Sequence, residues 1–339
     1  MSEKINRRSF LNRMAGAGVL VATASLPSFG AEKKDADAQQ DAKNAGQELF
    51  PRRGRFERLS INVVTVNIGL EEPFSVLHIS DTHLTAAYPH ESEKKQTLCR
   101  RRSENFGGMQ EEALRDSLEW AKLHTDYVLH TGDLIDWQSE ANFDLVRKYF
   151  GRDIACCPGN HEFSPDMWLS DIKEYKAEGY KDLTRGLLQE NLPYELEFSS
   201  EVIKGVNFVM MDDVYAYVTE RQVRLFEKEV EKGLPIILCM HVPFLTPTIW
   251  RATKHYWERD EAKLKFTDAT VPKPDGDMLM QQEDPVTREF IEYLRHEPLL
   301  KAILAGHEHI TIQDRFSPTA MEYVVGANYL FCGQEVLFI

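Results

Sequence analysis

Short apolar runs that end in metal-binding types of residue constrain the fold of this 339-residue chain more than any other feature. The clearest case is Gly132-Asp133-x-x-Asp136, which follows the apolar run at residues 126–130. A run of this length bounded by turn residues is typical of a buried strand. Open α/β sheets bind ligands at the carboxyl ends of their strands, so Asp133 stands where a site can form. Taken alone, Gly-Asp after a strand is also an ordinary turn.

Four more motifs follow similar runs along the chain. They are Asp81-Thr82-His83, Gly159-Asn160-His161-Glu162, Met240-His241 and Gly306-His307-Glu308-His309. Between the runs at residues 74–80 and 126–130, Leu114, Leu118 and Ala121 recur at helical spacing. Such alternation of strand and helix predicts an α/β fold with parallel neighbouring strands and right-handed crossovers. We therefore expect folding to gather the five motifs into one site.

Other segments give weaker signals of secondary structure. Thr219 with Gln222 predicts a capping box at a helix start, and Pro285 predicts another helix start. Residues 84–108 form a polar segment, and residues 243–283 show no clear period and predict a loop. Further strands are predicted at residues 61–68, 194–198, 202–203, 206–211, 235–240, 302–305, 323–325, 329–331 and 336–339.

The side chains that the motifs offer form a ligand set for metal. They are Asp81, His83, Asp133, Asn160, His241, His307 and His309. Carboxylate, imidazole and amide oxygen suit divalent Mn, Fe or Zn, and the absence of thiolates argues against a structural zinc site. Seven ligands exceed the needs of one tetrahedral ion, so the set predicts two divalent ions. Two ions about 3.5–4 Å apart form the usual clamp for displacement at phosphorus.

The net charge of −14 argues against two classes of binding partner. An acidic chain does not steer itself toward nucleic acid or anionic lipid, so neither is expected to bind. A phosphorylated substrate needs local positive charge, which bound metal can supply. The five cysteines show no disulfide or zinc-ribbon spacing and are interpreted as small hydrophobic residues.

The amino terminus predicts export. Asn6-Arg7-Arg8-Ser9-Phe10-Leu11 resembles a twin-arginine signal, so residues 1–30 are expected to engage that export machinery and bring the protein to the periplasm or the extracellular space. The alternative is a frayed amphipathic terminus. The apolar run at residues 14–26 is shorter than the roughly 20 residues that span a bilayer, so no stable membrane span is expected. Residues 31–55 are polar and predict a disordered linker.

In this order, the five motifs resemble those of the calcineurin-like metallophosphoesterase superfamily over roughly residues 60–339. The resemblance implies a catalytic domain at residues 56–339 with an α/β fold, a four-layer α/β/β/α sandwich of two mixed β-sheets flanked by helices. By the family pattern, Asp81, His83 and His309 hold one metal, Asn160, His241 and His307 hold the other, and Asp133 bridges both.

The activity that the resemblance implies is hydrolysis of a phosphate ester by in-line attack of a hydroxide shared by the two ions. His161 is not a ligand in the family pattern and would bind the phosphate or protonate the leaving oxygen. Asp136 would orient His161 and favour its charged form. Glu162 either supports the site or takes part in catalysis, and the first interpretation is favoured.

The substrate class stays open between a small phosphodiester and a phosphomonoester. Protein phosphatases of the family carry an Arg soon after Asp136, but Trp137-Gln138 follows here, so a phosphoprotein is a less favoured alternative. A non-catalytic metal-dependent binding module on the same fold is a second alternative. The basic run Arg100-Arg101-Arg102 is either a solvated face or a contact for substrate phosphate.

Overall fold

The computed structural model describes residues 56–150, 155–164, 180–258 and 285–339. From Leu59 onward these residues belong to one compact unit, and a second unit ends at Arg58. The expected export signal at residues 1–30 and the linker at residues 31–55 lie outside the described residues and stay predictions.

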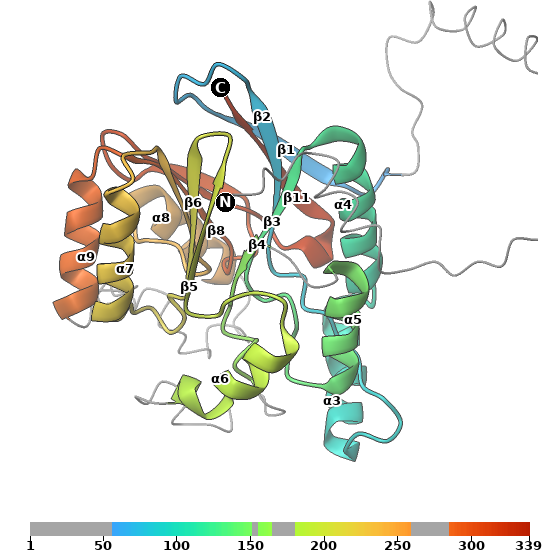
Figure 1. Ribbon diagram of the computed structural model, residues 1–339. Coiled ribbons are helices and arrows are strands. Elements are labelled where there is room, and N and C mark those ends of the chain that lie inside the picture. The colour runs from blue at the N-terminus through green and yellow to red at the C-terminus, as the bar shows by residue number, and fades with distance from the viewer. Residues whose placement is uncertain (1–55, 151–154, 165–179, 259–284) are drawn as a thin grey trace, which may run out of the picture. The chain divides into compact units, whose positions relative to one another are not determined.

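The first sheet has five strands in the order β1-β11-β2-β3-β4 (Figure 1). Strands β2, β3 and β4 are parallel, as the alternation of strand and helix predicted. The last strand, β11, lies between β1 and β2, parallel to β1 and antiparallel to β2. The sheet is therefore mixed. Its strands are β1 (Ser60–Val66), β2 (Phe74–Ile79), β3 (Tyr127–Thr131), β4 (Ala155–Cys157) and β11 (Cys332–Phe338).

The second sheet has six strands in the order β5-β6-β7-β8-β10-β9. Strands β6, β7, β8 and β10 are parallel, whereas β5 and β9 pair antiparallel at the two edges. The strands are β5 (Phe198–Ile203), β6 (Val206–Met211), β7 (Ile236–Cys239), β8 (Leu300–Ala305), β9 (Ile312–Arg315) and β10 (Met321–Val324).

Apolar side chains from both sheets share one core. Val76 and Leu129 of the first sheet belong to the same buried cluster as Phe208 and Leu304 of the second. The helices α4 (Gln110–His124) and α5 (Glu140–Phe150) cover the other face of the first sheet, and α7 (Glu220–Val230) and α9 (Pro285–His296) cover that of the second (Figure 1). The predicted four-layer α/β/β/α sandwich is confirmed.

Strand β2 shows why the motif-bearing runs are almost wholly apolar. All six of its residues are buried. Val76 faces the core between the sheets, whereas Leu77 and Ile79 face the core beneath α4. A strand buried on both faces needs apolar residues at consecutive positions, and each such side chain contributes about 1.5–3 kcal/mol of burial free energy. The run thereby holds the residues that follow it at the sheet edge.

Several local predictions are confirmed. The capping box of α7 is present, with the Thr219 hydroxyl accepting from the Gln222 amide and the Gln222 side chain accepting from the Thr219 amide. Helix α9 begins at Pro285. All five cysteines are free thiols, and Cys156, Cys157 and Cys239 are buried.

Other local features differ from the predictions. The polar segment at residues 84–108 contains the helix α3 (Glu93–Asn105), which was not predicted because it has no apolar stripe and buries none of its residues. Helix α8 (Pro247–Glu258) lies within the loop predicted at residues 243–283, of which residues 259–283 lie outside the described residues. Residues 329–331 were predicted as a strand but belong to the 3₁₀ turn η3 (Asn328–Leu330) and its left-handed cap at Phe331, with φ 63°. Strand β5 begins only at Phe198.

Helix α6 (Tyr180–Asn191) was not predicted. It contributes Leu188 to the core beside α4 and α5.

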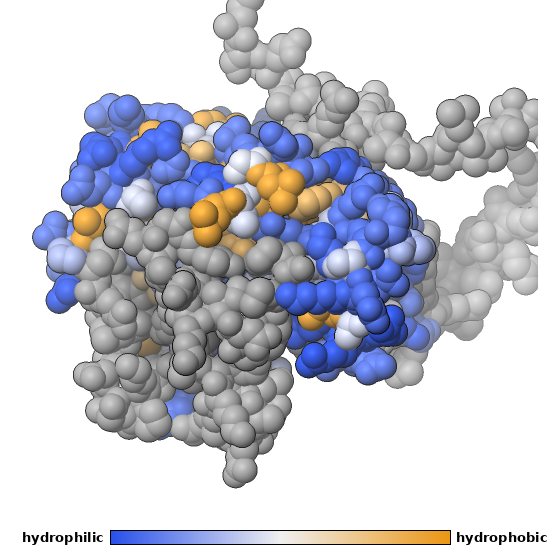
Figure 2. Space-filling view, turned by 90° about the horizontal axis from the view of Figure 1, so that it is seen from below, coloured by the Kyte–Doolittle hydropathy of each residue, from blue (hydrophilic) through white to orange (hydrophobic). Residues whose placement is uncertain are grey.

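The described surface is mainly hydrophilic in the view from below (Figure 2). Among the helices of the described ranges, none is both long and apolar enough to cross a bilayer.

Candidate metal centre

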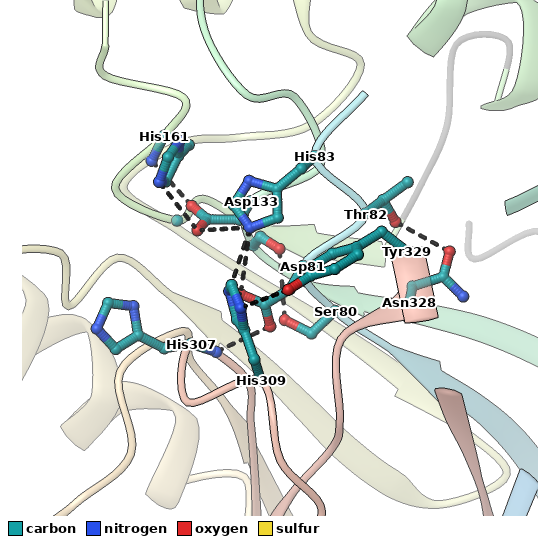
Figure 3. Close-up of polar contacts among 12 residues, drawn as sticks. Ser80, Asp81, Thr82, His83, Asp133, His161, His307, His309, Asn328 and Tyr329 are labelled. Carbon is teal, nitrogen blue, oxygen red and sulfur yellow. Dashed lines mark hydrogen bonds and ion pairs between the residues drawn. The ribbon is translucent and has the colours of Figure 1, made fainter. Parts of the chain in front are cut away.

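The five motifs meet at one edge of the two sheets, as the sequence predicted, and Figure 3 shows residues from four of them. Strand ends from the first sheet and from the second contribute side chains to the same centre, because the parallel strands of both sheets end there. Asp81 and His83 follow β2, Asp133 follows β3, Asn160 and His161 follow β4, His241 follows β7, and His307 and His309 follow β8.

Asp133 lies between two of the histidines. Its Oδ2 atom is 3.6 Å from Nε2 of His83 and 3.4 Å from Nε2 of His241. These two histidines come from different sheets, so one buried carboxylate oxygen connects the two halves of the centre.

Among the described residues, three overlapping groups of side chains could each hold a metal ion. Within each group the candidate ligand atoms lie within 4.8 Å of one another. The groups are Asp81 with His83 and His309; Asp133 with His241 and His307; and His83 with Asp133 and His161. The first two correspond to the two ligand sets that the family resemblance implied, apart from Asn160, which is not among the residue types grouped.

Two buried oxygens support the fit to a cation. Oδ1 of Asp81 and Oδ1 of Asn160 are shielded from solvent and accept no hydrogen bond. Burying such an atom without a partner costs about 1–3 kcal/mol, and more when it is charged. A metal ion supplies the missing partner, since both atoms are oxygen donors of the kind that divalent cations use.

Contacts at Nδ1 orient the rings of two histidines. Nδ1 of His241 is 2.7 Å from the Thr131 carbonyl oxygen, and Nδ1 of His83 is 3.0 Å from Oδ1 of Asp136. When Nδ1 carries the proton and donates it to these acceptors, Nε2 presents its lone pair to the centre. The donor set and its orientation therefore fit divalent metal ions.

The backbone around the centre is strained. Five of its residues that are not glycine have positive φ, a conformation that costs such residues free energy and clusters at functional sites. They are Asp81 (53°), His83 (49°), Asp133 (53°), His307 (69°) and His309 (58°).

Gly132 and Gly159 are required by close packing. Gly132 has φ 91°, and a Cβ atom there would lie 2.5 Å from Nδ1 of His241. A Cβ atom on Gly159 would collide with the carboxylate of Asp133. The two glycines let the chain pass directly beneath two of the predicted ligands.

Asp136 and His161, the two predicted catalytic residues, are in contact. Nδ1 of His161 lies 2.9 Å from Oδ1 of Asp136 and 2.9 Å from its backbone oxygen. Burial alone would lower the pKa of His161, but the carboxylates of Asp133 and Asp136 outweigh it and raise that pKa to about 9. Burial would raise the pKa of Asp136, but hydrogen bonds and charge from Arg102 hold it well below its usual range.

Glu162 supports the site instead of facing it. Its carboxylate accepts hydrogen bonds from the backbone amides of Asp133, Leu134, Ile135 and Gly159, at distances of 2.6–3.1 Å. Burial, and then the neighbouring Asp133 charge, raise its pKa to about 7. The four amides belong to two motif loops, so Glu162 ties the loop of Asp133 to its own.

Sequence interpretation missed several supporting residues. The Tyr329 hydroxyl lies 3.1 Å from Nδ1 of His309, and Oδ1 of Asp213 accepts from the backbone amides of His241 and Val242. Asp213 follows β6, so its strand-end position was a usable signal. Tyr329 gave none, because it was assigned to a strand. Arg102, the last residue of the basic run, binds Asp136 and does not lie on a solvated face.

Comparison with known proteins places the chain in a family. The model of the family described as calcineurin-like phosphoesterase matches residues 74–311, which is more than half of the sequence. Those residues include all seven predicted metal ligands together with Asp136 and His161. Among curated proteins, none matches the sequence.

Three solved structures illustrate the range of similar chains. A dimetal phosphatase from Danio rerio is 15% identical, with a TM-score of 0.44, and the match covers 76% of this chain and 88% of that one. The purple acid phosphatase PPD1 from yellow lupin seeds is 12% identical, with a TM-score of 0.46 and coverages of 77% and 45%. The NAD nucleotidase of Haemophilus influenzae is 12% identical, with a TM-score of 0.37 and coverages of 76% and 51%.

The chain thus spans most of the first of these proteins and about half of the other two. The family match carries the assignment, and the clusters of aspartate and histidine at the strand ends agree with it. The chain is a member of the calcineurin-like phosphoesterase family, whose activity is metal-dependent hydrolysis of phosphoric esters.

Proposed function

We propose that this protein hydrolyses a small phosphate ester with two divalent ions held at the shared edge of its sheets. One observation carries the proposal: Oδ2 of Asp133 lies 3.6 Å from Nε2 of His83 and 3.4 Å from Nε2 of His241. A single carboxylate oxygen close to an imidazole of each ligand set is placed to serve two adjacent cations.

The remaining donors divide into two sets around Asp133. In the proposal Asp81, His83 and His309 hold one ion, and Asn160, His241 and His307 hold the other. The unsatisfied buried oxygens of Asp81 and Asn160 support one ion in each set. Carboxylate, amide and imidazole donors without thiolates favour Mn, Fe or Zn.

Bound ions of this kind neutralise charge on phosphoryl oxygens and lower the pKa of water. His161 serves the reacting ester directly. Its Nδ1 is bound to Asp136 and its Nε2 is 4.0 Å from Oδ2 of Asp133, so Nε2 is directed toward the centre. From there it can donate a hydrogen bond to the phosphoryl group or a proton to the leaving oxygen. Asp136 keeps the ring in that orientation.

The residues after Asp136 favour a small ester over a phosphoprotein. Trp137 and Gln138 are buried, and the Gln138 amide group donates to the Glu162 carbonyl oxygen. Neither offers the substrate a cation of the kind that an Arg at this position would supply. We propose a phosphomonoester or a small phosphodiester as the substrate.

The test compares p-nitrophenyl phosphate with bis(p-nitrophenyl) phosphate, using the full chain with Mn²⁺. We expect one or both to release p-nitrophenolate, with loss on chelation and recovery when Mn²⁺ returns. The ratio of kcat/KM values assigns the mono- or diester preference. Calorimetric Mn²⁺ binding without release from either ester would instead support a non-catalytic binding module.

We also propose that residues 1–30 direct export through the twin-arginine machinery to the periplasm or beyond. The proposal rests on the Arg7-Arg8 pair and the short apolar run that follows. Cell fractionation of the wild type and of an Arg7→Lys, Arg8→Lys double variant tests it. Equal distribution of both proteins in the cytoplasm contradicts it.

A further inference from the structure

Arg102 of helix α3 forms a two-point ion pair with Asp136. Its Nε atom lies 2.6 Å from Oδ2 and its Nη2 atom 2.7 Å from Oδ1 of that carboxylate. The arginine side chain is 11% exposed and the aspartate side chain 1% exposed. A planar guanidinium that binds both oxygens fixes the plane of a carboxylate as well as its charge.

One oxygen of this carboxylate, Oδ1 of Asp136, also contacts two histidines of the metal centre. Oδ1 of Asp136 is 3.0 Å from Nδ1 of His83 and 2.9 Å from Nδ1 of His161. Three donors therefore converge on one atom: Nη2 of Arg102, Nδ1 of His83 and Nδ1 of His161. A rotation of the Asp136 carboxylate would disturb a predicted ligand and the predicted catalytic histidine together.

Phe106, the residue that caps α3, completes a closed ring of contacts. The guanidinium carbon of Arg102 lies 4.5 Å from the centre of the Phe106 ring. That ring stacks on His83, with 4.6 Å between centroids and an interplanar angle of 20°. His83 is thus held at its edge by Asp136 and on its face by Phe106, and Arg102 contacts both of these residues.

The contacts join a segment outside the five motifs to the centre. Arg102 and Phe106 are linked by a helical hydrogen bond, from the Phe106 amide to the Arg102 carbonyl at 3.0 Å. Helix α3 buries none of its residues, so core packing does not explain its position. The last turn of α3 instead makes its closest polar contact with Asp136.

We propose that Arg102 is a positioning residue, which fixes the Asp136 carboxylate so that His83 and His161 are both oriented for metal binding and catalysis. The role in catalysis rests on the function proposed above, whereas the role in orienting His83 does not depend on turnover. Lysine cannot replace Arg102 fully, because a single ammonium group leaves the carboxylate able to rotate.

The test compares Arg102→Gln with Arg100→Gln. Arg100 is exposed on the same helix and bonds to Thr97 of that helix, so its variant makes the same chemical change away from the centre. We expect Arg102→Gln to weaken Mn²⁺ binding about 10–100-fold by calorimetry, in line with other residues that orient ligands. We expect kcat to fall by a similar factor with KM nearly unchanged. Arg100→Gln should match the wild type in both.

Rescue separates positioning from folding. Arg102→Lys should fold normally and recover only part of the lost Mn²⁺ affinity, and added guanidinium should partly restore kcat to Arg102→Ala. A role limited to stability would lower the melting temperature without changing the Mn²⁺ affinity or the ratio of kcat to KM. That result, or equal Mn²⁺ affinities in Arg102→Gln and Arg100→Gln, overturns the proposal.

The same experiments distinguish failure of the proposed function from failure of the positioning role of Arg102. If the wild type turns over neither ester, the Mn²⁺ affinities of the two variants still decide whether Arg102 orients His83. If the wild type is active and both glutamine variants equal it, the positioning role alone is wrong. Should Arg102→Gln not fold, Arg102→Lys provides the same comparison.

Discussion

The hydroxyl of Tyr329 lies 3.1 Å from Nδ1 of His309 (Figure 3). Nε2 of His309 faces Oδ1 of Asp81 at 3.3 Å. Tyr329 belongs to the 3₁₀ turn η3, which lies outside the five motifs. Burial raises the pKa of Tyr329, so the phenol stays neutral. Its oxygen accepts a hydrogen bond when Nδ1 of His309 carries the proton.

Tyr329→Phe should weaken metal binding. Without the oxygen, the His309 ring loses the contact that sets its orientation, and affinity for one ion should fall about tenfold. Calorimetry with Mn²⁺ measures the change. Tyr293→Phe is the control, because it removes a phenol that bonds to Glu297 at 3.1 Å on the distant helix α9. Equal affinities in the two variants would contradict a role for Tyr329.

Asp133→Asn should lower the occupancy of both metal positions. An amide keeps one oxygen but loses the negative charge that faces His83 and His241. Elemental analysis of the dialysed protein should give fewer than two ions per chain. Asp144→Asn, a change in a half-exposed surface ion pair with Arg147, should leave the metal content unchanged. Full occupancy in Asp133→Asn would rule out a bridging carboxylate.

His161→Ala should keep the metals and the fold but lose activity. Removing a group that donates to the substrate typically costs about 10²–10⁴-fold in kcat. Steady-state kinetics and metal analysis of the same sample measure both properties. The exposed His124 gives the control variant His124→Ala. If His161→Ala loses an ion, His161 is a metal ligand and not a catalytic group. Its position close to His83 and Asp133 also permits that role.

Glu162→Gln should destabilise the protein. The carboxylate accepts from four backbone amides, whereas a glutamine side chain presents an NH₂ group toward some of these donors. Leaving a buried amide unpaired costs about 1–3 kcal/mol. Urea unfolding measures the loss. Glu140→Gln, in an exposed pair with His90, should change the free energy of unfolding far less.

Stability should fall in acid because of two buried histidines. Burial lowers the pKa values of His78 and His130 to about 3. Between pH 6.5 and 3 the unfolded chain takes up protons that the folded chain does not, so stability decreases as pH falls. Each histidine contributes a slope of up to about 1.4 kcal/mol per pH unit. Urea unfolding across this window should show a flatter dependence for His78→Gln and His130→Gln, and an unchanged slope would refute the assignment.

The local sequence pattern was enough to predict which strand ends carry the site. A strand buried on both faces is mainly apolar, as β2 is, and the residue types that follow it are visible in the chain. Parallel strands end at the same edge, so the sequence alone predicts that Asp81, Asp133 and His241 meet there. The capping box at Thr219 is local in the same way, since its two members are three residues apart.

Contacts between distant segments decided the rest. Arg102 is 34 residues from Asp136, and Tyr329 is 20 residues from His309. Neither pair carries a sequence pattern, because α3 has no apolar stripe and residues 329–331 form a short apolar run that is typical of a strand. Only the packing of α3 and η3 against the strand ends brings these partners within hydrogen-bonding distance. The chain's local patterns therefore indicated which side chains would meet at the strand ends, whereas contacts between distant segments, which leave no local pattern, set which side chains orient them.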